Sequence, residues 1–147
     1  MSTTAPTTLN PSIVGRAEKH HNAILNRALA GTTVDETQWI VLNQALAAGA
    51  PIDPAAHITR VAAMTQWNHA DVEAGLAALL ATGLLRSLPT GQAEPTEAGR
   101  ALAARVRTES TAILQAAYGT VTPEDLATAG RVLDTITARM AEELARA

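Results

Sequence analysis

Apolar residues recur at helical spacing along most of this 147-residue chain. From Pro11 they repeat every three or four positions through Ile13, Ile24 and Ala28, and Gly31 can end this first run. Five further stripes of the same period begin near residues 35, 53, 68, 96 and 122. The pattern therefore predicts six helices.

The predicted helices begin at residues that can accept hydrogen bonds from free backbone N–H groups. These N-cap candidates are Asp35, Asp53, Asn68, Thr96 and Thr122. Proline follows Asp53 and Thr122, in the favoured first helical position. Asp35 and Gln38 have the spacing of a capping box, in which each side chain satisfies a backbone N–H.

A short β element interrupts the helical pattern between residues 83 and 96. Gly83 ends the fourth helix, and Leu84 and Leu85 form a short apolar run that predicts a strand. Residues 89–91, Pro-Thr-Gly, predict a turn, after which a second, weaker strand can return.

Composition supports a mainly helical, single-domain protein. Hydrophobic residues make up 47% of the chain but aromatic residues only 2%, so Ala and Leu must build the core. Residues 1–10 are Thr-rich and aperiodic, which predicts a flexible leader before a single domain over 11–147. No segment resembles a signal peptide or a membrane span, so we expect a cytoplasmic protein without membrane contacts.

Three segments, in order, resemble the MarR family of winged helix-turn-helix transcription regulators. VDETQWIVLNQAL resembles the family's second helix, and VEAGLAALLATGLL resembles its recognition helix running into the wing. EPTEAGRAL resembles the return into the long dimer helix, where Thr96, Gly99 and Arg100 match the pattern Leu-Thr-x-x-Gly-Arg.

This resemblance implies a mainly α winged helix-turn-helix fold with six helices, one small β wing and a helical dimerisation region from both termini. Residues 11–31 and 97–147 would supply the dimerisation helices, and 35–96 the DNA-binding lobe. The resemblance implies a homodimeric transcription regulator, a repressor that binds a pseudo-palindromic operator in double-stranded DNA. A small-molecule effector would modulate its activity. The fourth helix would enter the major groove.

The sequence departs from the family pattern where DNA would be contacted. The wing tip, SLPTGQAEP, has no basic residue, and the recognition helix has Asp71 and Glu73 where the family has hydroxyl side chains. The formal net charge of −3 also lacks the basic footprint of nucleic-acid binders. The candidate DNA contacts are Asn68, His69, Asp71 and Glu73 in the groove and Arg60 and Arg86 on the backbone. His57 and His69, if protonated, would add to the positive charge near the groove.

Trp39, His21 and Arg105 are candidate contacts for a small effector, because the family binds ligands between its dimer helices and its DNA-binding lobe. Simpler roles also fit: a core position for Trp39, an interfacial position for His21 and a solvated helix face for Arg105.

The residue types give no support for an enzyme, a cofactor site or a metal site. The chain has no cysteine, which excludes disulfides and thiolate zinc sites, and its glycines form no phosphate-binding loop. Two other classes of function remain open: a winged-helix protein-interaction module that has reduced or lost DNA binding, and a ligand-binding module.

Overall fold

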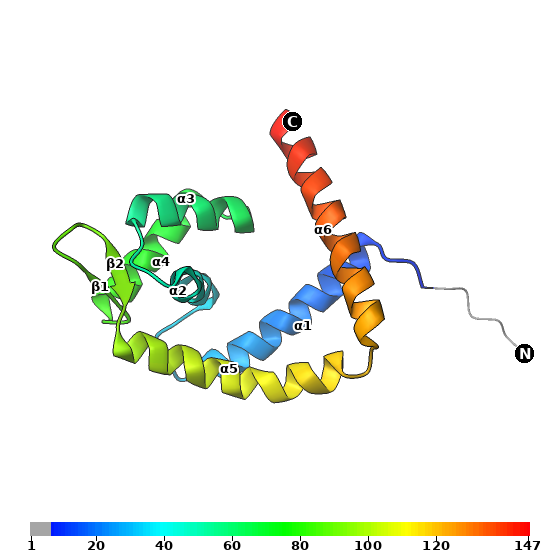
Figure 1. Ribbon diagram of the computed structural model, residues 1–147, viewed down its shortest axis with the longest axis horizontal. Helices are drawn as coiled ribbons and strands as arrows, with labels where there is room; N and C mark the ends of the chain where they lie inside the picture. Colours follow the sequence, from blue (N-terminus) through cyan, green and yellow to red (C-terminus); the bar gives the residue numbers. More distant parts are fainter. Residues whose placement is uncertain (1–6) are drawn as a thin grey trace, which may run out of the picture. The chain divides into compact units, whose positions relative to one another are not determined.

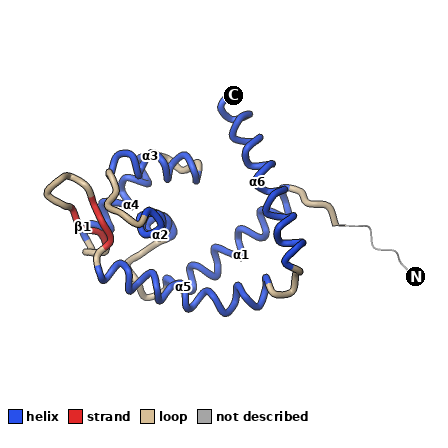
Figure 2. Tube along the Cα trace, viewed as in Figure 1, coloured by secondary structure: helices blue, strands red, loops and turns tan. Residues whose placement is uncertain are grey.

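The computed structural model describes residues 7–147, in which six helices and one two-stranded sheet follow the predicted order. The chain divides into two compact units, residues up to Ser110 and residues Thr111–Ala147, and the boundary falls inside the fifth helix. Figures 1 and 2 show the elements. They are α1 (Pro11–Leu29), α2 (Glu36–Ala48), α3 (Pro54–Thr65), α4 (His69–Ala81), β1 (Leu85–Ser87), β2 (Ala93–Pro95), α5 (Glu97–Tyr118) and α6 (Pro123–Arg146).

The predicted N-caps are confirmed. The side chains of Asp35, Asp53 and Thr122 each accept a hydrogen bond from the backbone N–H three residues later. Asn68 accepts from Ala70 N at 2.8 Å, so α4 begins one residue after its predicted cap. These caps satisfy N–H groups that have no partner inside the helix.

The capping box at Asp35 forms only in part. Asp35 Oδ1 accepts from Gln38 N at 2.8 Å, as predicted. Gln38 Oε1, however, is buried without a hydrogen-bond partner among the described residues. α4 covers this turn, because a Cβ on Gly75 would lie 3.2 Å from Thr37 Cγ2. Tertiary packing therefore overrides the reciprocal half of the local motif.

The core of the first unit lies between α2, α3, α4 and the sheet. The stripes predicted for α3 and α4 face it, with Val61 and Val72 almost fully buried. Gln66, at the turn between these two helices, takes a left-handed conformation (φ 59°). The helix–turn–helix arrangement of α3 and α4, packed on α2, is visible in Figure 1.

The predicted β element is a short antiparallel hairpin, the wing. Arg86 pairs with Glu94 at its centre, and Leu85 pairs with Pro95. The strand begins at Leu85 and not at Leu84, which is buried directly before it. Gly91 takes φ 86° in the predicted turn. Ile52, between α2 and α3, adds an isolated bridge to Ala93 on the wing.

The start of α5 is tied to the end of α4. Thr96 Oγ1 donates to the carbonyl of Gly83 at 2.6 Å and accepts from Gly99 N at 3.1 Å. A Cβ on Gly99 would overlap the carbonyl oxygen of Leu84. The Thr-x-x-Gly spacing is therefore required by the close approach of α5 to the segment that enters the wing.

The second unit contains the last turns of α5 and all of α6. No side chain within residues 111–147, all of which are described, is buried. The predicted apolar stripe of α6 is therefore exposed, with Leu133 at 38%, Ile136 at 41%, Met140 at 52% and Leu144 at 59%.

The predicted flexible leader falls mostly on residues 1–6, which lie outside the described residues. Asn10 N-caps α1 by accepting from Ile13 N at 3.0 Å. No helix within residues 7–147 is long and apolar enough to span a lipid bilayer.

Candidate nucleic-acid interface

The outer face of α4 is exposed along its whole length. Val72, Leu76 and Leu79 point into the core, which leaves His69, Glu73 and several alanines on the solvent side. Asn68, His69, Asp71 and Glu73, the four predicted groove contacts, are all exposed. They lie at the N-terminal end of a helix whose other face is fixed by packing, as a recognition helix requires.

Arg60 lies on α3 and is held by a buried histidine. Its Nη2 lies 2.9 Å from His57 Nδ1, and His57 Nε2 lies 3.0 Å from the carbonyl oxygen of Val41 on α2. A carbonyl can only accept, so Nε2 carries the proton and Nδ1 accepts from the guanidinium. Arg60 has no carboxylate partner within residues 7–147, so its charge is available to an anion.

The expectation that His57 adds positive charge is wrong. His57 is 3% exposed. Burial lowers the pKa of His57 from its usual 6.5, and the nearby Arg60 lowers it further, whereas the hydrogen bond to Val41 opposes this. A buried imidazole with one acceptor role and one donor role is stable only in its neutral form.

Arg86, the other predicted phosphate contact, is already paired. Both its Nε and its Nη2 donate to Glu94 Oε1 on the opposite strand. The Arg86 side chain is 64% exposed, so it can still reach solvent, but Glu94 neutralises its charge. The wing therefore presents little net positive charge to DNA.

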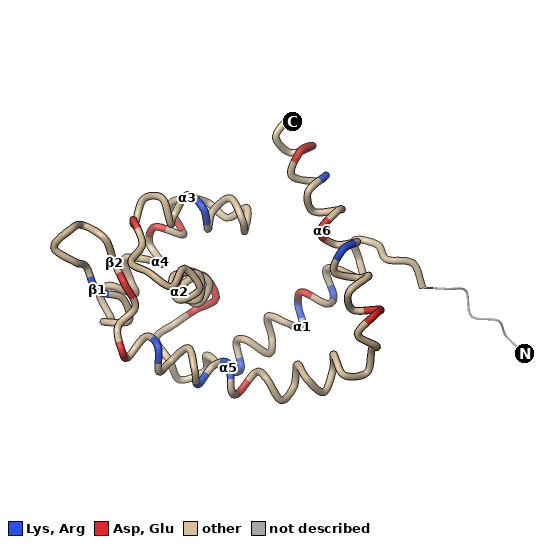
Figure 3. The backbone as a smooth tube through the Cα atoms, in the orientation of Figure 1, with Lys and Arg blue, Asp and Glu red and all other residues tan. Residues whose placement is uncertain are grey.

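The lobe as a whole is acidic. Residues 35–96 contain two arginines and no lysine, against six aspartates and glutamates. α4 has no lysine or arginine, and Figure 3 shows the basic positions of this lobe on α3 and at β1. Within residues 35–96, Arg60 and Arg86 are therefore the basic side chains that phosphate could contact.

Solved structures that are similar to this chain include transcription regulators of the MarR family. A MarR-family regulator from Silicibacter pomeroyi matches with a TM-score of 0.71 and 20% identity, over 88% of each chain. CouR from Rhodococcus jostii RHA1, bound to p-coumaroyl-CoA, matches with a TM-score of 0.71 and 18% identity, over 84% of this chain and 88% of that one. BpsR from Bordetella bronchiseptica matches with a TM-score of 0.65 and 22% identity, over 86% and 96%.

The chain has a MarR-type winged-helix fold. No protein-family model matches it, and no curated protein matches it either. The likeness to solved structures at such low identity establishes the fold, and function has to be argued from the residues.

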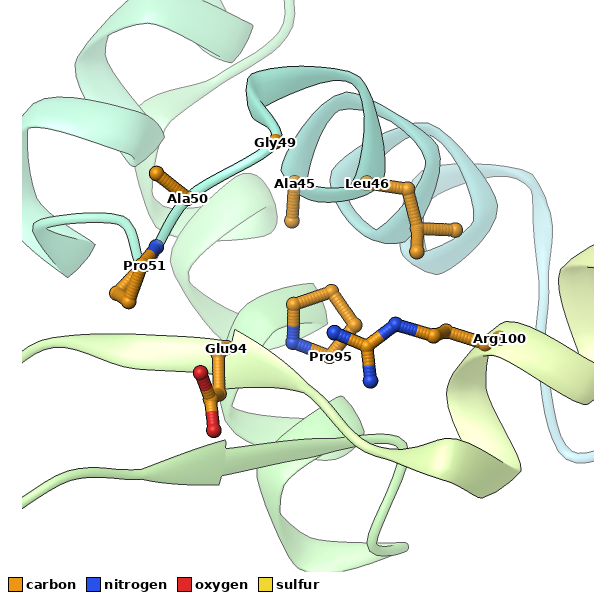
Figure 4. Close-up of a pocket in the computed structure, with 8 residues that line it drawn as sticks. All are labelled: Ala45, Leu46, Gly49, Ala50, Pro51, Glu94, Pro95 and Arg100. Carbon is orange, nitrogen blue, oxygen red and sulfur yellow. The ribbon is translucent and has the colours of Figure 1, made fainter.

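Within this MarR-type fold, none of the three candidate effector contacts lines the cleft between α2, the wing and α5 that Arg100 borders (Figure 4). Trp39 is 8% exposed and belongs to the core. His21 is exposed, and its Nδ1 lies 2.7 Å from the carbonyl oxygen of Ala17, one turn earlier on α1. Arg105 is 55% exposed and pairs with Glu109 at 3.7 Å. Trp39 thus occupies a core position, and Arg105 lies on a solvated helix face.

Three site residues were missed or misjudged from the sequence. The role of His57 depends on Val41, 16 positions earlier, so local pattern gives no sign of it. The Arg86–Glu94 pair could have been found, because the two residues lie symmetrically about the predicted turn. The sequence indicates Arg100 as part of the Thr-x-x-Gly-Arg motif and as a further phosphate contact, but gives no sign that it lines a cleft beside the wing.

Proposed function

We propose that the protein is a homodimeric, sequence-specific DNA-binding transcription regulator of the cytoplasm, a repressor whose activity is modulated by a small-molecule effector. The observation that carries this proposal is the exposed outer face of α4, on a helix–turn–helix with Arg60 on the preceding helix. A helix of about 10–12 Å diameter can enter the major groove, where its first turns contact the base edges.

The chemistry of the α4 face favours a restricted mode of DNA recognition. His69 and Asn68 can donate to base acceptors, and Glu73 can accept from a cytosine amino group. The exposed alanines Ala70, Ala74 and Ala77 can contact thymine methyl groups. The carboxylates at residues 71 and 73 are repelled by phosphate, so we expect weak non-specific binding.

The exposed stripe on α6 supports the homodimer. A monomer would leave Leu133, Ile136, Met140 and Leu144 in water over about three turns of the helix, and apolar stripes of this kind mark association surfaces. We propose that residues 111–147 of a second copy of the chain cover this stripe. The resulting dimer would present two α4 helices to the two halves of a pseudo-palindromic operator.

Two of the similar structures support an effector. The structure of BpsR concerns the regulation of its DNA binding by 6-hydroxynicotinic acid, and CouR is bound to p-coumaroyl-CoA. Trp39, His21 and Arg105 remain the predicted effector contacts of this chain under the proposal.

The experiment that tests DNA binding compares charge-removing variants at low salt. A genomic pull-down with the purified protein first selects duplexes, and fluorescence anisotropy then measures affinity against salt concentration. Arg60, Arg86 and Arg100 would provide about two to four effective phosphate contacts per subunit, so a plot of log Kd against log salt concentration should have a small slope. Arg60→Gln should lower that slope by about one and weaken binding to all sequences alike.

Glu73→Gln provides the sharper test of the α4 position. Removal of a carboxylate from the groove should tighten non-specific binding, whereas Glu18→Gln, an exposed change of the same charge on α1, should have a smaller effect. Equal affinities of the two variants would mean that α4 does not lie in the groove. Failure of every duplex to bind at micromolar protein would reject the proposed function.

A second candidate is a winged-helix protein-interaction or ligand-binding module without DNA binding. The observation that favours it is the acidic lobe, in which Glu94 neutralises the wing arginine. Selective recovery of a protein partner, with no enriched DNA, would support this alternative.

A further inference from the structure

One face of α1 carries a line of basic side chains. Arg16, His20 and Arg27 lie within about 40° of one another around the helix axis, because successive residues turn by about 100°. Lys19 lies beside this line, about 60° from Arg16. We call these four side chains the α1 basic stripe, and each of them is exposed. Figure 3 shows basic positions along α1.

The other side of α1 is the side that packs. Ala28 and Leu29 are buried there, and Leu25 packs against the core. Glu18 is the one carboxylate of residues 1–34, and it lies about 160° from Arg16 around the helix. The α1 basic stripe is therefore directed away from both the core and the carboxylate of its own helix.

The charges of the α1 basic stripe are not compensated by carboxylates. Arg16, Lys19 and Arg27 form no ion pair with any residue between 7 and 147. The ion pairs of that part of the chain involve arginines of the wing, α5 and α6 instead. His20 Nδ1 donates to the carbonyl oxygen of Arg16 at 2.7 Å, which leaves Nε2 for another partner.

The α1 basic stripe is opposite in sign to the lobe that contains α4. Residues 1–34 contain three arginines and lysines against one carboxylate, whereas residues 35–96 contain two arginines against six carboxylates. Affinity for duplex DNA comes largely from basic side chains that displace counterions from phosphates. Glu94 compensates Arg86, so the lobe supplies few contacts of this kind. A polyanion therefore finds in α1 the positive charge that the lobe lacks.

We propose that the α1 basic stripe binds the phosphate backbone of duplex DNA, as a second contact that reads no sequence. Arg16 and Arg27 are 11 residues apart, so the stripe extends about 16 Å along the helix axis. Each strand of a duplex carries a phosphate about every 3.4 Å along its axis, so this length matches roughly four or five phosphates. The inference rests on the proposed function, because its occupant is the DNA that α4 would read.

The test uses a duplex of random sequence and measures its affinity for the full-length protein by fluorescence anisotropy, at salt concentrations from about 50 to 200 mM. The double variant Arg16→Gln, Arg27→Gln removes two charges from the α1 basic stripe. The double variant Arg105→Gln, Arg131→Gln is the matched control, because it removes the same charge from exposed positions on α5 and α6. Circular dichroism and light scattering check that both variants fold and assemble like the unmodified protein.

A phosphate contact contributes a little under one unit to the slope of log Kd against log salt concentration, which is about threefold in affinity over this range. The variant Arg16→Gln, Arg27→Gln should therefore lower the slope by about one to two and weaken duplex binding by about threefold to tenfold at the lowest salt. The control should keep the slope of the unmodified protein. An unchanged slope in the α1 variant would overturn the proposal, and so would an equal decrease in the control, because the duplex would then respond to net charge alone.

Glu73→Gln in the same assay separates this proposal from the proposed function. A response to Glu73→Gln without a response to the α1 variant would keep α4 in the groove and reject the α1 basic stripe. The reverse result would keep the stripe and place α4 outside the groove. Absence of duplex binding by the unmodified protein would reject both. Loss of polyglutamate binding in the α1 variant, with duplex binding unchanged, would also overturn the proposal, because the stripe would then fit an acidic protein.

Discussion

The guanidinium of Arg60 donates to Nδ1 of His57 at 2.9 Å, and this single contact couples the surface of α3 to the interior of the lobe. His57 in turn donates from Nε2 to Val41 on α2, at 3.0 Å. Both ring nitrogens are thus used, and the hydrogen bond that Nδ1 accepts from Arg60 requires the neutral ring. An added proton on Nδ1 would face the positive charge of Arg60.

This arrangement predicts that the free energy of unfolding decreases in mild acid. The pKa of His57 is lowered in the folded state by burial and by Arg60, while the unfolded chain titrates near 6.5. Below about pH 6.5 the unfolded state therefore binds more protons than the folded state, and the stability contributed by neutral His57 is progressively lost. Above pH 6.5 this contribution is fully present.

Chemical denaturation at pH 7.5 and pH 5.5 measures the effect. In His57→Gln, the loss of unfolding free energy between these two pH values should be smaller than in the unmodified protein, whatever the overall stability of the variant. His69→Gln, at an exposed position, is the matched control. An identical loss in the unmodified protein and His57→Gln would show that His57 does not titrate as the structure requires.

Leu79 should contribute strongly to stability. It is fully buried on α4, and the backbone N–H of Leu84 donates to its carbonyl at 2.9 Å, beside the entry to the wing. Leu79→Ala should lower the unfolding free energy by about 2–5 kcal/mol, as buried leucine truncations do. Met64→Ala, at a side chain that is 53% exposed, should cost far less. A loss below about 1 kcal/mol for Leu79→Ala would contradict the helix register.

Two glycines in helices should respond in opposite directions to alanine. Gly99 on α5 has no space for a Cβ, because the Leu84 carbonyl oxygen occupies that position and backbone cannot move aside cheaply. Gly130 on α6 has no atom within 4 Å of its Cβ position. Gly130→Ala should therefore stabilise the protein by about 0.5–1 kcal/mol through its helix propensity, and Gly99→Ala should destabilise it. Thermal unfolding of the two variants distinguishes them, and stabilisation by Gly99→Ala would rule out the close approach to Leu84.

The sequence could predict the order and type of the elements because their signals are local. The period of the apolar residues and the caps at Asp35, Asp53 and Thr122 act within one or two turns, and the structure confirms them. The missed features depend on tertiary packing. Gln38 loses its capping role where α4 crosses it, and His57 finds its acceptor on another helix.

The exposure of the candidate site could be predicted from the sequence, but its electrostatics could not. All four predicted groove residues at the start of α4 are exposed, as the apolar stripe on the opposite face implies. The charges could not be assessed from the sequence, because a basic residue attracts phosphate only if no neighbouring carboxylate compensates its charge. Arg86 is paired by the register of the wing, whereas Arg60 keeps its charge because its partner is a neutral imidazole.

The proposed homodimer predicts a change of oligomeric state on loss of the α6 stripe. Deletion of residues after Thr120 should give a monomer or an aggregate, and the double variant Ile136→Glu, Met140→Glu should give a monomer by light scattering. Both side chains are at least 41% exposed, so the substitutions should not disturb a core. Thr135→Glu on α6 is the control for the added charge. A stable dimer after the deletion would exclude α6 from the interface.

Glu94→Gln should turn the wing into a stronger DNA contact. The carboxylate of Glu94 now holds Arg86 through two hydrogen bonds, so the guanidinium must leave this partner before it can bind phosphate. A neutral amide binds the guanidinium less strongly and removes a charge that phosphate repels, so non-specific DNA affinity should rise and the salt slope should steepen.

Arg86→Ala should act in the opposite direction. In the double variant Arg86→Ala, Glu94→Gln the gain should be smaller than in Glu94→Gln alone, because part of it comes from the released arginine. Fluorescence anisotropy at several salt concentrations measures all three variants. An equal gain with and without Arg86 would mean that Glu94 acts only by its own repulsion and that the wing arginine does not reach the DNA.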